Sequence, residues 1–118
     1  MKIQLAAEKL ARARRALMLP HCRGEAEDIS DAFLYCSQGF DHLGSELLGD
    51  SIRSLIAVIS EIMDTSGIDK NGKVGPLVIK AERLTKNQKL ELSRAVDELA
   101  HTLERRYWKI EYGSAPQA

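Results

Sequence analysis

The sequence predicts an all-α protein: an antiparallel four-helix bundle with a short extended or β-hairpin arm between helices three and four. Three observations support this fold class. Apolar residues recur at spacings of three and four in four segments, which places them on one stripe of a helix each time. The links between the first three segments are short. At 118 residues, 44% of them hydrophobic, the chain can bury one core without disulfides. We therefore expect a single domain over 1–112 and a flexible tail over 113–118.

The first helix is expected over residues 2–19. Lys and Arg side chains fall mostly outside its apolar stripe, which identifies the buried face. Pro20 ends the helix, because its ring removes an amide donor and pushes Leu19 out of helical geometry. The stripe consists of Ile3, Ala6, Leu10, Ala13 and Leu17.

The second helix is expected to begin at or beside Gly24 and to close at Gly44, a residue suited to the left-handed end of a helix. Its first turn holds Glu25, Glu27 and Asp28, and acidic side chains there complement the positive end of the helix dipole. The connection PHCRG is short, so the first two helices should be antiparallel neighbours. The buried stripe consists of Ile29, Ala32, Phe33, Cys36, Phe40 and Leu43.

Charge is distributed unevenly although the net charge is zero. Residues 1–23 carry six Lys/Arg against one Glu, and residues 24–50 carry seven Asp/Glu and no Lys/Arg. Because the two segments are expected to be neighbours, we interpret the charges as mutual neutralisation between the first two helices.

The third helix is expected over residues 50–66, the most apolar continuous segment, and should contact each of the other three helices. Its stripe consists of Ile52, Leu55, Ile56, Ile59, Ile62 and Met63. Residues 67–84 form the arm, since an Asp-Lys-Asn-Gly turn precedes a β-branched run around Val74, Val78 and Ile79.

The last helix begins with a capping box at Thr85, because Gln88 lies three residues further on and can accept a hydrogen bond from the Thr85 amide. Its outer face mixes acidic and basic side chains and is typical of a solvated surface. The buried stripe consists of Leu92, Val96, Leu99, Leu103, Tyr107 and Ile110.

Several functional classes are disfavoured by composition. The longest apolar run is too short for a membrane span, and no secretory signal is recognisable, so a cytoplasmic location with reduced cysteines is expected. Zero net charge and the acidic second helix argue against nucleic-acid binding. The Cys and His residues lack the spacing of a zinc site, so we expect no metal and no cofactor.

Two places stand out as candidate sites. Arg15, His21 and Arg23 surround the first turn, where cations beside a helix N-terminus make either an anion-binding site or an ordinary polar turn. The second place is a partner interface, because Trp, Tyr and Arg dominate interface anchors and an exposed arm could pair with another chain. The candidate interface residues are Leu77, Ile79, Arg106, Tyr107 and Trp108.

No catalytic residue is assigned from these observations. We expect a small non-enzymatic interaction or regulatory protein that forms a homodimer or binds a protein partner. The alternative is a small helical ribonuclease or toxin of the HEPN type, in which an Arg and a His a few residues apart act at a helix junction. Arg15 and His21, with five residues between them, would take those roles; this spacing is common by chance.

Overall fold

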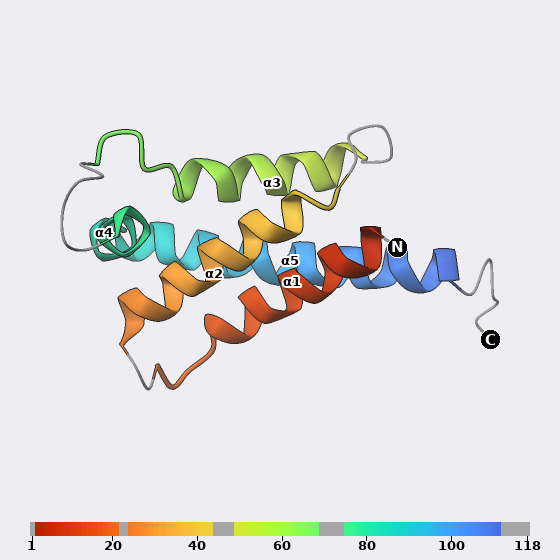
Figure 1. Cartoon of the computed structure of the whole chain (residues 1–118), viewed down its shortest axis with the longest axis horizontal. Coiled ribbons are helices and arrows are strands. Elements are labelled where there is room, and N and C mark those ends of the chain that lie inside the picture. The colour runs from red at the N-terminus through yellow and green to blue at the C-terminus, as the bar shows by residue number, and fades with distance from the viewer. Residues whose placement is uncertain (1, 22–23, 44–48, 69–74, 112–118) are drawn as a thin grey trace.

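The computed structural model describes residues 2–21, 24–43, 49–68 and 75–111. Over this part of the chain it is all-helical, which confirms the predicted class, and none of these residues lies in a strand. The helices, shown in Figure 1, are α1 (Lys2–Ala16), α2 (Glu25–Phe40), α3 (Asp50–Ile62), α4 (Pro76–Arg83) and α5 (Lys86–Glu111).

The first two helices are antiparallel neighbours, as predicted, and both are shorter than expected (Figure 1). After Ala16 the chain leaves the helix through a turn in which the Leu17 amide donates to the carbonyls of Ala13 and Arg14. Gly24 precedes α2 with φ 115°, a conformation that glycine adopts without the steric cost of a side chain. The α2 helix ends at Phe40, whereas the predicted closing residue, Gly44, lies outside the described residues.

Close contact between α1 and α2 depends on Gly39, which is buried where the helices meet. A Cβ at Gly39 would lie 2.5 Å from Leu10 Cδ2 and 3.2 Å from Lys9 Cβ. The Ala6 carbonyl oxygen would be 3.4 Å away. The absence of a side chain therefore allows the two backbones to approach.

The predicted extended or β-hairpin arm is wrong for residues 76–83, which form α4. Pro76 occupies the first turn of this helix, where a missing amide hydrogen costs nothing, and β-branched Val78 and Ile79 are accommodated within it. Ala81 and Leu84 are buried, and α4 packs against α2. The Asp-Lys-Asn-Gly turn, residues 69–72, lies outside the described residues.

The capping box at the start of α5 is confirmed. The Thr85 amide donates to Gln88 Oε1 at 2.8 Å, and the Gln88 amide donates to Thr85 Oγ1 at 3.1 Å. These reciprocal bonds satisfy two amides that have no partner within the helix, and they fix the position at which the longest helix begins.

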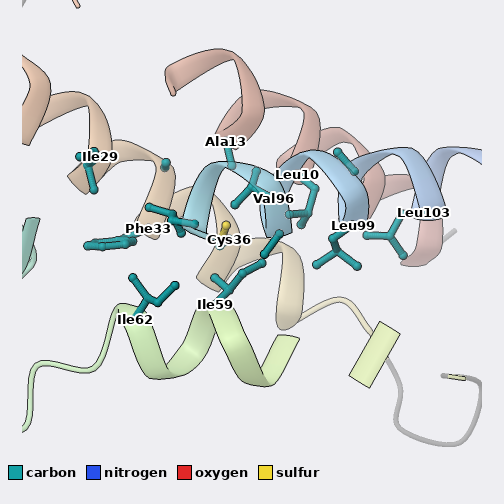
Figure 2. Packing of buried hydrophobic residues seen from close by; sticks show 14 of the residues in the cluster. Leu10, Ala13, Ile29, Phe33, Cys36, Ile59, Ile62, Val96, Leu99 and Leu103 are labelled. Atoms are coloured by element: carbon teal, nitrogen blue, oxygen red, sulfur yellow. The ribbon is translucent and has the colours of Figure 1, made fainter. Parts of the chain in front are cut away.

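The core does not surround α3 as predicted. The extensive contacts of α3 are with α5, whereas α1 contacts both α2 and α5. Figure 2 shows Ile59 and Ile62 of α3 pointing towards Phe33, Cys36 and Leu99. One face of α3 is thus buried, while Leu55, Ile56, Val58 and Met63 are only partly buried.

Candidate functional site

A groove lies between α1 and α5, which run side by side in opposite directions (Figure 1). It encloses about 280 Å³ and combines an apolar floor with polar edges. The floor is formed by Ala7 and Ala11 of α1 and Ala100 of α5. Gln4, Glu8, Arg14, His101 and Glu104 contribute the polar lining, and Tyr107 and Trp108 close one end.

Small side chains explain why the groove exists. Ala7 and Ala11 are four residues apart and therefore lie on one flank of α1, beside the buried stripe. Ala100 lines the groove opposite them from α5, so these three side chains fill little of the space above the helix contact. Sequence reasoning overlooked this site, because the two alanines belong to no apolar stripe and α5 begins some seventy residues after α1 ends.

The aromatic end of the groove contains two of the predicted interface residues. The rings of Tyr107 and Trp108 are 5.6 Å apart between centroids and inclined by 61°, an edge-to-face arrangement. Trp108 is 49% exposed, a large fraction for an apolar side chain of this size. An accessible indole beside a small-residue floor is suited to contacting another molecule.

The other predicted interface residues lie elsewhere. Arg106 Nη2 lies 3.7 Å from the position a Cβ on Gly49 would occupy, next to the start of α3. Leu77 and Ile79 belong to α4, near the opposite end of α5, roughly 30 Å from Trp108 along the helix. Leu77 also packs against the core. The structure therefore brings together Tyr107 and Trp108, but not the five residues as one surface.

A charged cluster borders the groove beyond the alanine floor. Arg14 Nε donates to Asp97 Oδ1, joining α1 to α5. His101 Nδ1 donates to the Asp97 carbonyl at 2.9 Å and lies 3.5 Å from Oδ1 of the same residue. The hydrogen bond from Arg14 lowers the pKa of Asp97. This cluster fixes the two walls of the groove relative to each other.

The first turn contains a second polar cluster. His21 Nδ1 donates to Asp28 Oδ2 at 2.9 Å, and both side chains are largely buried. Arg15 is exposed and lines a shallow depression with Asp28 and neighbouring polar side chains of α1 and α2. Arg23 lies outside the described residues. The structure thus places Arg15 and Asp28 along one depression, with His21 bound to Asp28.

Charged side chains of α1 and α2 are paired in part with side chains of α5. Between α1 and α2, Lys9 Nζ lies 5.9 Å from the centroid of the Tyr35 ring, a cation–π contact with an uncharged partner. Lys89 Nζ of α5 lies 2.5 Å from Glu25 Oε1 of α2, and this hydrogen bond lowers the pKa of Glu25. Together with the Arg14–Asp97 pair, this contact shows that α5 supplies partners the sequence assigned to α1 and α2 alone.

Among the described residues, no three His, Cys, Asp or Glu side chains form a group able to hold a metal ion. In the same part of the chain, no helix has the length and apolar character needed to cross a membrane. Burial raises the pKa of the Cys36 thiol to about 12, so this residue is a packing side chain and not a nucleophile.

The described part of the chain is thus a helical protein with an open groove between its first and last helices. No protein-family model matches the sequence, and no match was found among curated proteins or solved structures.

Proposed function

We propose that this chain is a non-enzymatic interaction or regulatory protein that engages a protein partner, including a copy of itself, through the α1–α5 groove. The observation that carries this proposal is the exposed Trp108 at the end of an alanine-floored groove. Buried aromatic anchors surrounded by polar edges account for most of the binding energy in protein interfaces. We place this activity in the cytoplasm, where a thiol such as Cys36 stays reduced.

The groove is best suited to a helix. Its floor follows two antiparallel helices, so a third helix can lie along them with one side chain inserted over each alanine. Acidic Glu8 and Glu104 stand on the edges near the aromatic end, which favours a partner with a basic side chain at that position.

Site-specific photo-crosslinking in the source cell tests the proposal. A photoreactive amino acid at Ala11, on the exposed edge of the groove floor, should give a discrete crosslinked protein. The same probe at Ser54, on the exposed surface of α3, is the matched control and should not give that product. Adding Trp108→Ala to the Ala11 probe should abolish the product. Equal crosslinking from Ala11 and Ser54 would reject the groove as the binding site.

A ribonuclease or toxin of the HEPN type, using Arg15 and His21, is the second candidate. The specific observation in its favour is the 2.9 Å contact of His21 with Asp28. A carboxylate bound to Nδ1 fixes the tautomer and leaves Nε2 to transfer a proton, while the nearby Arg15 can bind a phosphate. Incubation with RNA tests this candidate, with His21→Ala as the inactive variant and His101→Ala as the control. Absence of cleavage by the unmodified protein would eliminate it.

A further inference from the structure

The α5 helix carries a second stripe of side chains on its outer surface. The residues recur at spacings of four, three, four, three and four, the repeat by which helices pair along a seam. All but Asp97 are exposed, and Leu90 and Trp108 at the two ends are 61% and 49% exposed. The outer stripe consists of Leu90, Arg94, Asp97, His101, Glu104 and Trp108.

The outer stripe can pair with the outer stripe of a second chain that runs in the opposite direction. Its spacing is the same in both directions, so a second α5 running antiparallel can meet it around a two-fold axis level with Leu99. That register places Leu90 opposite Trp108, an apolar pair at each end. It also places Arg94 opposite Glu104, a pair of opposite charge that occurs twice because of the symmetry.

In the same register, the second α5 helix would also fill the groove. Residues 100–108 of α5 form one wall, so the first half of a second α5 would lie over the alanine floor. The partner's Leu90 would reach the Trp108 end. The partner's Arg94 would stand between Glu104 and Glu8, the two acidic residues on the groove edges. At the centre of the seam, the partner's His101 would face Asp97, which Arg14 already contacts.

We propose that a second copy of this chain occupies the α1–α5 groove. The two copies form an isologous dimer in which their α5 helices pack antiparallel about a two-fold axis at the level of Leu99. This inference rests on the proposed function, because it names the partner of the same groove. The centre of the outer stripe is charged and only its ends are apolar, so the dimer forms reversibly and weakens as salt is added.

Charge reversal tests the register. By sedimentation velocity at low salt, the unmodified chain should pass from monomer to dimer as its concentration rises. Arg94→Glu places like charges together twice and should raise the dissociation constant about tenfold or more. Combining Arg94→Glu with Glu104→Arg restores both pairs and should restore dimerisation. The matched control is Lys109→Glu, an exposed α5 position that projects about 100° around the helix from Trp108 and does not belong to the outer stripe, so it should change little.

Mixing the doubly reversed variant with the unmodified chain gives the most specific test of the register. The doubly reversed variant should dimerise with itself but not with the unmodified chain, because every mixed pair carries like charges. Circular dichroism verifies that each variant remains folded. A strictly monomeric chain, or equal effects of Arg94→Glu and Lys109→Glu, would overturn the inference. The proposed function would survive that outcome if the Ala11 probe still captured a different protein, and it would fail if the groove captured nothing.

Discussion

At the scale of single residues, the helix contacts are controlled by small side chains as much as by large ones. Gly39 allows α1 to approach α2, and Ala7, Ala11 and Ala100 leave the groove open. Large side chains such as Phe33 and Leu99 fill the core that these contacts enclose. A substitution that adds volume at a small residue should therefore have effects that depend strongly on the surroundings of that residue.

Gly39→Ala should destabilise the protein by about 1–3 kcal/mol. Alanine is the better helix former by about 1 kcal/mol, but its methyl group would overlap Leu10, whose fully buried side chain can shift only by displacing other core side chains. Urea unfolding measures the change. Gly67→Ala is the control, since no atom of the described residues other than its chain neighbours lies within 4 Å of a Cβ there, and its effect should be small. Equal stabilities of the two variants would contradict the close contact.

Cys36 should make stability depend on alkaline pH. Its pKa is raised from 9.0 to about 12 by burial, so the unfolded chain loses this proton near pH 9 while the folded chain keeps it. The stabilisation is fully present below pH 9 and declines towards pH 12, by up to about 1.4 kcal/mol per pH unit. Comparing urea unfolding of the unmodified chain and Cys36→Ala at pH 8 and pH 10 isolates this effect. Parallel losses in the two proteins would disprove it.

At the scale of elements, local signals determined which helix boundaries could be predicted. The Thr85 capping box involves residues three apart, so its geometry follows from the sequence alone. The prediction of an extended arm was wrong for residues 76–83, because contacts with distant residues outweigh the local preference of this segment. Val78 and Ile79 favour a strand locally, but contact between α4 and α2 and the burial of Ala81 and Leu84 stabilise a helix. The groove could not be predicted, because it requires knowing that α1 docks against α5.

Thr85→Ala should cost about 0.5–2 kcal/mol, because the Gln88 amide loses its acceptor at the start of α5. Thr102→Ala removes the same chemical group within the helix, where the hydroxyl donates to the Glu98 carbonyl. That carbonyl needs no further donor, so the Thr102 variant should remain within about 0.5 kcal/mol of the unmodified protein. Thermal and urea unfolding compare the two. A Thr102 effect as large as that of Thr85 would argue against a specific capping role.

At the scale of the whole molecule, α1 lies at the centre of the helix contacts, between α2 and α5, and α3 lies towards one side, beyond α5. The prediction of a central third helix followed from its apolarity, yet apolarity alone does not say how many neighbours a helix has. Leu55, Ile56 and Val58 remain half-buried, because α5 is the helix of the described chain with which α3 makes extensive contact, and it lies on one face of α3. Since the stripes of the four long helices have the same spacing, their pairing depends on contacts between distant residues and could not be deduced from periodicity.

This arrangement predicts the order in which the helices open. Amides within α3 should exchange with solvent at least about tenfold faster than those at the centres of α1 and α5, after correction for intrinsic rates. The physical reason is that the backbone of α3 lies close to one helix, α5, and meets α2 through side chains such as Ile62, whereas α1 lies close to both α2 and α5. Hydrogen exchange followed by mass spectrometry resolves the peptides covering 54–62, 8–13 and 96–103.

The short α4 helix serves as an internal reference for the hydrogen-exchange rates of α3. It has eight residues, and few of its side chains are fully buried, so its amides should exchange faster than those of α3. Ile52, Ile59 and Ile62 are nearly inaccessible and should keep α3 measurably protected. Protection of α3 equal to that of α5 would mean that the two helices open together, and would contradict the separate opening of α3.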